Sequence, residues 1–268
     1  MKVILSRKGF DSANGAIPSP ILPDGTLLSL PIPSGDGITY GDIVWQGKRY
    51  VEIIKELCPN SPIAENSLCH LDPDLRESTY PRTNGWMPAY GQTGASLTEL
   101  RKNGVGLGDL FLFFGWFRQT TIIEGKLKYI RQSRDIHVIF GYLQIGHIFD
   151  NYEELPEWLK YHPHANLQHY KKSWQTHQNA IFIPTDKLSF NDGIGGSGVF
   201  NFNAAVTLTK KGYPRTRWEF PKSMHGIEIS HNPKGWKDDY FQSSPIGQEF
   251  VFDCNNAVME WLKPMFEK

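Results

Sequence analysis

The sequence has few cysteines, and the three present, Cys58, Cys69 and Cys254, form no CxxC pair. An odd number of thiols without that spacing excludes both a disulfide framework and a cysteine-rich zinc site. Long apolar runs are also absent: none reaches the about 18 residues that a membrane span needs, and the apolar start at residues 3–5 is too short for a signal peptide. We therefore expect a soluble, cytoplasmic protein with no membrane partner.

The chain also lacks a net charge, because 28 lysine and arginine residues balance 28 aspartate and glutamate residues. Without an overall basic field, any contact with nucleic acid must be local. The glycine-rich stretch 193–198 has no Lys-Ser/Thr pair, which argues against a P-loop and favours a flexible loop. With 25 glycines, 18 prolines and 13% aromatic residues, the composition indicates a strand-rich globule with many loops.

Two apolar runs, residues 108–118 and 137–146, are the most strand-like parts of the sequence. Continuous β-branched and aromatic runs of this length predict neighbouring strands that are buried on both faces. The glycines inside them indicate bulges or close approaches of another backbone. Shorter strands are expected at residues 2–6, 180–183, 200–209 and 247–252.

Helices are predicted at residues 50–57, 153–161 and 258–265 from the spacing of their apolar residues. A further helix is expected to follow a capping box at 96–99 and to end at Gly104. These elements predict an α+β fold with a mixed or antiparallel, barrel-like sheet and a few flanking helices. We expect one domain over residues 1–268, with a strand core at about 105–210 and a loop-rich segment at about 9–92 packed on it.

The loop after the first expected strand carries two cations and a glycine, Arg7, Lys8 and Gly9. The planar fork of an arginine gives paired hydrogen bonds to phosphate, and glycine lets the backbone approach an anion closely. We interpret Arg7 and Lys8 as substrate-binding residues and Asp11 as a candidate general base. The alternative is an ion pair between Arg7 and Asp11 that only fixes the loop.

His70, Asp72 and Asp74 alternate along the chain, so that in an extended conformation all three side chains point the same way. Such a face suits acid–base catalysis or a divalent metal, whereas the alternative is a turn in which an aspartate bonds its own backbone. His162 and His164 share a face under the same condition, and two histidines with Asp72 would suit a first-row metal. The alternative there is a helix-ending turn with satisfied imidazoles. The residues leave the cofactor undetermined, with a divalent metal as the open option.

Trp116, Phe117 and Arg118 form a flat, cationic group on which a nucleic-acid base could stack. Surface cation–π packing is the alternative interpretation. Gln248 and Glu249 lie on opposite faces of an expected strand, so only one of them can point into a given pocket and read a base edge. We predict that these five residues contribute to substrate binding.

Several of these segments together resemble the bacterial family of nucleotide modification proteins with the third type of nucleotide modification associated domain. The resemblance is carried by residues 6–11, 18–21, 30–33, 70–74, 108–118, 162–164 and 247–251. It spans nearly the whole chain, and Ala16 departs from it where the family pattern has a second glycine. The resemblance implies a nucleotide or DNA with a modified base as the partner, alongside the proteins of a DNA modification system. A looser similarity, at Gly108-Asp109 and 141–146, is to the PUA and EVE domains that bind modified bases.

Two hypotheses for the function follow. The first is an enzyme that modifies a nucleotide or a DNA base, in which Arg7 and Lys8 hold phosphate and the acids and imidazoles do the chemistry. Its candidate catalytic residues are Asp11, His70, Asp72, Asp74 and His164. The second is a binding module that recognises a modified base without catalysis, and a third, weaker one is a structural subunit of a modification or defence complex. The enzyme hypothesis predicts that the cations, acids and imidazoles share one cleft.

Overall fold

The computed structural model describes residues 1–244 and 249–267. Its first strands are β1 (Lys2–Arg7), β2 (Ser19–Ile21), β3 (Ile32–Thr39), β4 (Val44–Trp45), β5 (Lys48–Arg49), β6 (Leu68–His70), β7 (Tyr90–Thr93), β8 (Leu110–Ile123) and β9 (Lys126–Tyr129). The later strands are β10 (Ile136–Phe149), β11 (Asn179–Pro184), β12 (Lys187–Leu188), β13 (Asn191–Gly195), β14 (Ser197–Val199), β15 (Arg217–Trp218), β16 (Phe241–Gln242) and β17 (Glu249–Asp253). The α-helices are α1 (Tyr50–Leu57), α2 (Gly94–Lys102), α3 (Leu167–Gln175) and α4 (Asn256–Phe266).

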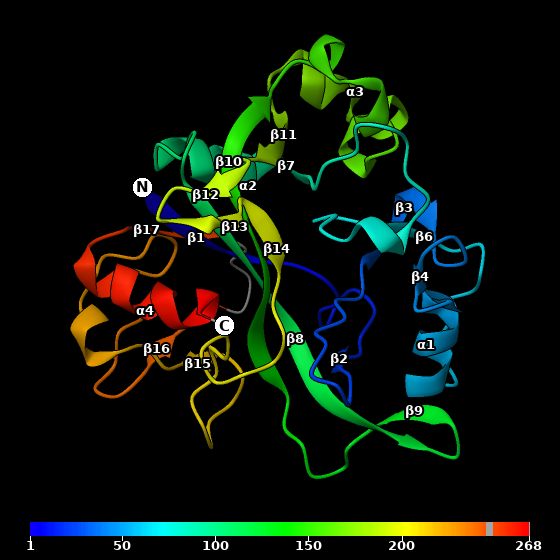
Figure 1. Cartoon of the computed structure of the whole chain (residues 1–268), viewed down its shortest axis with the longest axis horizontal. Coiled ribbons are helices and arrows are strands. Elements are labelled where there is room, and N and C mark those ends of the chain that lie inside the picture. The colour runs from blue at the N-terminus through cyan, green and yellow to red at the C-terminus, as the bar shows by residue number, and fades with distance from the viewer. Residues whose placement is uncertain (245–248, 268) are drawn as a thin grey trace.

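One large sheet organises the molecule, with the strand order β17-β1-β8-β10-β11-β7 (Figure 1). β2 and β9 also pair with β8, and β14 pairs with β10. The sheet is mixed, because β1 runs parallel to β8 whereas β8 and β10 are antiparallel. It curls into a half-barrel, and with the helices it gives the α+β class that the sequence predicts.

The two long strands β8 and β10 form where the sequence has its apolar runs, and they are direct neighbours as expected. Their register shifts between Ile139 and Gly141, which is a β-bulge. A Cβ atom on Gly141 would lie 2.9 Å from the carbonyl oxygen of Gly198 in β14. The interior glycine therefore marks both a bulge and a close approach of another strand.

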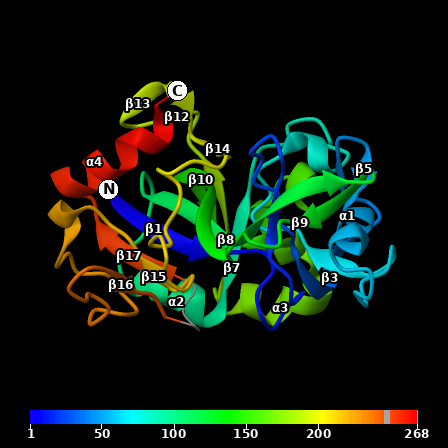
Figure 2. The same ribbon diagram turned by 90° about the horizontal axis from the view of Figure 1, so that it is seen from below.

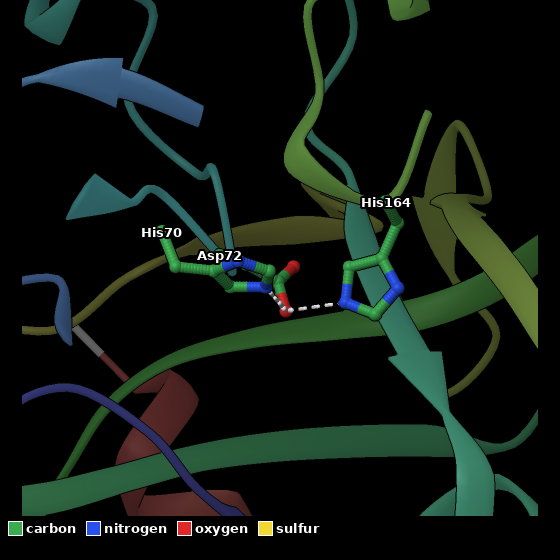
Figure 3. A group of neighbouring side chains, drawn as sticks. All are labelled: His70, Asp72 and His164. Carbon is green, nitrogen blue, oxygen red and sulfur yellow. Dashed lines mark ion pairs between the residues drawn. The ribbon is translucent and has the colours of Figure 1, made fainter. Parts of the chain in front are cut away.

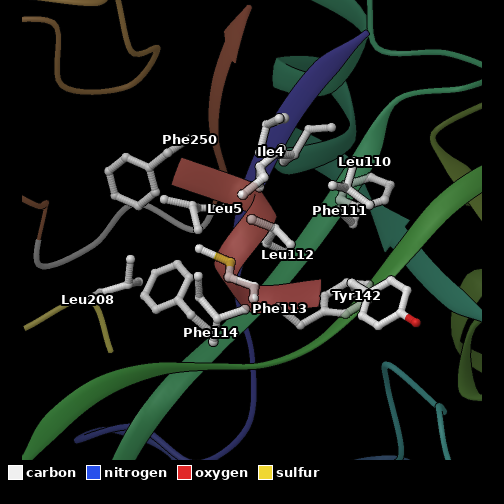
Figure 4. Packing of buried hydrophobic residues seen from close by; sticks show 14 of the residues in the cluster. Ile4, Leu5, Leu110, Phe111, Leu112, Phe113, Phe114, Tyr142, Leu208 and Phe250 are labelled. Carbon is white, nitrogen blue, oxygen red and sulfur yellow. The ribbon is translucent and has the colours of Figure 1, made fainter. Parts of the chain in front are cut away.

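The largest core cluster lies on β1, β8, β10 and β17 (Figure 4). Ile4 and Leu5 of β1 lie beside Phe111 and Leu112 of β8, and Phe250 of β17 lies beside Leu5 on the other side, all in this cluster. Full burial of such a side chain contributes about 1.5–3 kcal/mol. The core therefore fixes β1 between β17 and β8, and with β1 it fixes the loop that begins at Arg7.

Two smaller clusters pack beside the sheet. One joins the buried face of α1 to Phe10, Leu28 and Leu30 of the N-terminal segment. The other joins Trp174 of α3 to Phe149 at the end of β10. Figure 2 shows α1 and β3 on the opposite side of β1 and β8 from α4. The segments with β3 and β6 and with α3 thus lie at one end of β1.

The helices at 50–57 and 258–265 are confirmed as α1 and α4, and Gly104 follows α2 with a φ of +65°, as expected of a helix stop. α2 begins at Gly94 with Thr93 as its N-cap, so the predicted capping box at 96–99 is wrong.

None of the helices in the described part of the chain combines the length and the apolar character that crossing a membrane requires.

Three other local predictions are wrong. Residues 153–161 form two short 3-10 segments instead of a helix, because Pro156 stands between them. Residues 200–209 make isolated bridges instead of a strand, and residues 193–198 belong to β13 and β14 instead of a flexible loop. In the last two cases, pairing with other segments decides the structure.

Candidate functional site

A polar cleft opens where the end of β1 meets β3, β6, β7 and the start of α3. It has a volume of about 230 Å³. Its lining residues are Arg7, Lys8, Gly9, Asp11, Asn14, Ile32, Ser34, His70, Asp72, Gln92, Thr93, His164 and Tyr170. The structure therefore brings the predicted cations, one predicted base and three further candidate catalytic residues into one cleft.

Three of these side chains face one another, and we call His70, Asp72 and His164 the triad (Figure 3). His70 ends β6, which pairs with β3, and Asp72 follows in the next loop. His164 comes from a 3-10 turn, Pro163–Ala165, far along the chain. The Nε2 atoms of His70 and His164 lie 3.9 and 3.8 Å from Oδ2 of Asp72. These three side chains are 12%, 4% and 4% exposed, so they form a mostly buried centre at one wall of the cleft.

The outer atoms of the triad are held by further polar groups. Nδ1 of His70 is 3.2 Å from Oδ1 of Asp36 in β3, and Nδ1 of His164 is 2.6 Å from Oδ1 of Asn179 in β11. Since a carboxylate or amide oxygen accepts a hydrogen bond, both rings carry their proton on Nδ1 and turn a lone pair on Nε2 toward Asp72.

The carboxylate of Asp72 is fixed from behind. Its Oδ1 accepts a hydrogen bond from the backbone N–H of Gly91 at 2.7 Å, and Nε2 of His162 is 3.4 Å from the same oxygen. Nδ1 of His162 accepts from the backbone N–H of His164, so the His162 proton is on Nε2, the nitrogen nearer to Asp72. Oδ2 of Asp72 is left facing the two triad imidazoles.

Electrostatics set the charge of the triad. Burial raises the pKa of the Asp72 carboxyl, but the close approach of His162 and of the other imidazoles outweighs this effect and lowers the pKa to about 2. Burial lowers the pKa of His164 to about 3 against the opposing effect of Asp72. At neutral pH the site therefore has a carboxylate beside a neutral imidazole. These are the protonation states that bind metal ions and accept protons.

Two cations, Arg7 and Lys8, also line the cleft. Burial lowers the pKa of Arg7, which Asp11 raises and Arg215 lowers further. Lys8 is 3.4 Å from Oε1 of Glu249 and lies 4.6 Å from the ring centroid of Tyr90. Gly9 has a φ of +77°, which a side chain disfavours, and its backbone borders the cleft.

Glu249 lies next to Lys8 and not in the cleft itself. Its Oε1 accepts hydrogen bonds from Ser6, Tyr90 and Gln92 at 2.9, 3.1 and 2.6 Å. The carboxylate therefore anchors Lys8 and ties the end of β1 to β7. Gln248, its predicted neighbour in substrate binding, lies outside the described residues.

The remaining sequence candidates lie elsewhere. Asp74 is buried against Arg82 outside the cleft, and Phe117 is buried in the sheet core. Trp116 is covered by the guanidinium of Arg215, 4.2 Å from its ring centroid. Arg118 is 3.8 Å from Asp135 and lies over Tyr129.

Sequence reasoning missed the residues that hold the triad. Asp36 sits in a turn-rich stretch without a pattern, and Asn179 and Gly91 are ordinary residues of β11 and β7. Tyr170, which stacks on His164 with ring centroids 4.9 Å apart, gave no signal either. His162 carried the one available signal, its spacing of two from His164.

The fold and the cleft define an α+β protein with a curled mixed sheet and an imidazole–carboxylate centre beside two cations. The chain belongs to the nucleotide modification associated domain 3 family, whose model matches residues 2–253. This confirms the family resemblance and gives the protein a role associated with nucleotide modification. No curated protein and no solved structure shows a significant similarity to the chain.

Proposed function

We propose that the protein is an enzyme that modifies a nucleotide, or a base within nucleic acid, in the cleft. The observation that carries this proposal is the placement of Arg7 and Lys8 in the same cleft as the triad. A binding module needs cations and flat surfaces, but it has no use for a buried carboxylate between two imidazoles. Such groups are what proton transfer or metal-assisted chemistry requires.

The two cations of the cleft suit a phosphate group. Arg7 offers paired N–H donors, Lys8 adds a point charge, and Gly9 allows the backbone to approach. The ring of Tyr170, which lines the cleft and stacks on His164 with ring planes 12° apart, offers a flat surface on which a base can stack. The phosphate end and the base end of a nucleotide thus each have a matching surface.

The reactive groups are those of the triad. Asp11 is the weaker base candidate, because its carboxylate accepts hydrogen bonds from the backbone N–H groups of Ala13 and Asn14 and holds its own loop. Asp74 is committed to Arg82. Asp72, in contrast, turns one oxygen to the two imidazoles at the wall of the cleft. We assign the chemistry to His70, Asp72 and His164 and phosphate binding to Arg7 and Lys8.

Activity is tested by incubating the purified protein with mononucleotides and with DNA, adding a small-molecule cell extract as the source of co-substrates. Mass spectrometry then follows each substrate. We expect a mass change that is absent with the Asp72→Asn protein. In the Arg7→Ala protein, loss of charge-assisted hydrogen bonds is expected to raise KM by about 10- to 100-fold with a smaller change in kcat.

Arg101→Ala, at an exposed position on α2, is the matched control and should leave KM unchanged. Tight binding of DNA with a modified base would point to the non-catalytic module instead. If that binding comes with no mass change in any substrate and no effect of Asp72→Asn, the enzyme proposal is wrong.

A nucleic-acid strand, rather than a free nucleotide, is favoured by a second hollow of about 710 Å³, in which Arg118, Arg134 and Arg215 outnumber the one carboxylate, Asp135. Nη2 of Arg215 bonds Oγ of Ser12 at 2.7 Å, and Ser12 follows Asp11 at the edge of the cleft. Arginines placed there can contact phosphates next to the nucleotide in the cleft.

Arg134→Ala is expected to weaken DNA binding a few-fold and to reduce the slope of log affinity against log salt by about one. Binding of a mononucleotide should not change, because Arg134 lies outside the cleft. The measurement is fluorescence anisotropy at several salt concentrations. An equal loss for DNA and mononucleotide would contradict the assignment of this hollow to the strand.

A further inference from the structure

The triad has the composition and the geometry of a metal site. It offers two imidazole nitrogens and one carboxylate oxygen, and these ligand atoms all lie within 4.8 Å of one another. Around an ion with bonds of about 2.0–2.2 Å, neighbouring ligand atoms are about 3–3.5 Å apart. The observed separations of 3.8 and 3.9 Å therefore close onto one ion with movements of less than an ångström.

Hydrogen bonding does not account for this arrangement. At 3.8 and 3.9 Å the two Nε2 atoms are too far from Oδ2 of Asp72 for hydrogen bonds. Both Nδ1 atoms donate to Asp36 and Asn179, so each Nε2 atom presents a lone pair to Asp72. A carboxylate has no proton to donate to these lone pairs. Three acceptor atoms that converge in this way, mostly buried, form a site for a cation.

The surroundings match those of metal ligands in general. A ligating histidine typically donates its second N–H to a carboxylate or carbonyl oxygen, which fixes the ring and raises its basicity. Asp36 and Asn179 provide one such acceptor each. The buried Nε2 of His162 lies 3.4 Å from Oδ1 of Asp72 without a hydrogen bond to it. A small shift of Asp72 toward an ion keeps it within reach of His162.

We infer that His70 Nε2, His164 Nε2 and Asp72 Oδ2 bind one divalent first-row transition-metal ion, zinc or ferrous iron, in the wall of the cleft. Two histidines and one carboxylate occupy three positions, and the remaining positions face the cleft lined by Arg7 and Lys8. Water or a substrate oxygen can reach the ion from there. Metal binding rests on the geometry alone, whereas its part in catalysis rests on the proposed function.

The test starts with protein that has been stripped by a chelator and then titrated with Zn²⁺, Co²⁺ or, without oxygen, Fe²⁺. Isothermal titration calorimetry and elemental analysis should give one ion per chain. The visible spectrum of the Co²⁺ protein should show bands of nitrogen and oxygen ligation. His70→Ala and His164→Ala should each weaken the affinity by roughly 100-fold or more.

His177→Ala, which removes an exposed histidine outside the cleft, is the matched control and should bind the ion like the wild type. Circular dichroism checks that each variant is folded, and the wild-type titration decides the matter even if a variant does not fold. Failure of the folded wild type to bind any of the three ions at micromolar concentration would overturn the inference. So would unchanged binding after both triad histidines are replaced.

The two proposals fail in different ways. Metal uptake that depends on the triad, without turnover of any nucleotide or DNA, supports the metal site and counts against the enzyme. Turnover that is lost in Asp72→Asn but persists in stripped, metal-free protein supports the enzyme and overturns the part of the metal in catalysis, whereas metal binding itself is decided by the titration.

Discussion

The Gly91→Ala protein is expected to lose metal affinity at the triad by about 100-fold, although no ligand is removed. A Cβ atom at Gly91 would lie 2.2 Å from Cδ2 and 2.4 Å from Cγ of His164. The ring has no room to yield, because Asn179 holds it on one side and Tyr170 stacks on it. Any shift of Gly91 instead pulls its N–H away from Asp72. Calorimetric titration with Zn²⁺ measures the loss.

Gly106→Ala is the control for this change, since a Cβ there meets no atom within 4 Å. It should bind the ion as the wild type does. Wild-type affinity in a folded Gly91→Ala protein would show that the position of His164 does not control the site. In the Gly91→Ala protein, turnover should fall in parallel with metal affinity. The added Cβ atom thus tests the metal site and the enzyme proposal together.

Arg82→Ala is expected to cause a large loss in the free energy of unfolding. Nη1 and Nη2 of Arg82 bond the two carboxylate oxygens of Asp74 at 2.6 and 2.7 Å, and the side chains are 7% and 1% exposed. Tyr161 also bonds both partners, and Arg82 donates to the carbonyl oxygen of Arg76. Removing the guanidinium leaves a buried, uncompensated carboxylate, which costs about 3–5 kcal/mol in the free energy of unfolding.

Urea denaturation of the wild type and the variant measures this cost. The control is Lys160→Ala, which removes an exposed ion pair with Glu157 and should leave the unfolding midpoint nearly unchanged. If Asp74 were instead a catalytic base, Asp74→Asn would abolish turnover at undiminished stability. We expect lowered stability, because the structure places Asp74 outside the cleft and in this buried network.

Part of the site could be predicted from local spacing. The alternation of His70 and Asp72 places both on one face wherever the segment is extended, and the pair of His162 and His164 follows the same rule. The loop of Arg7 and Lys8 could be identified because it follows a strand. What spacing cannot give is which of these short segments meet. Asp74 has the same spacing as Asp72 and yet lies in a different environment.

The supporting residues could not be predicted, because each acts through a long-range contact. Asn179 reaches His164 only because β11 lies beside β7 in the sheet. Lys8 and Glu249, 241 residues apart, meet because β1 pairs with β17. A single asparagine or glutamate carries no local sign of such a partner.

The sequence by itself determined the mixed α+β class, the two central strands and the kinds of reactive side chain. Apolar runs and amphipathic spacing involve residues that are close in the sequence, so the strands and helices that they form can be predicted from the local sequence. Only the tertiary structure decided that His164 joins His70 and Asp72, that Asp74 and Phe117 are withdrawn into buried contacts, and that Asp36 and Asn179 orient the imidazoles. These outcomes depend on the pairing and packing of distant segments, whose free energy is shared over the whole core.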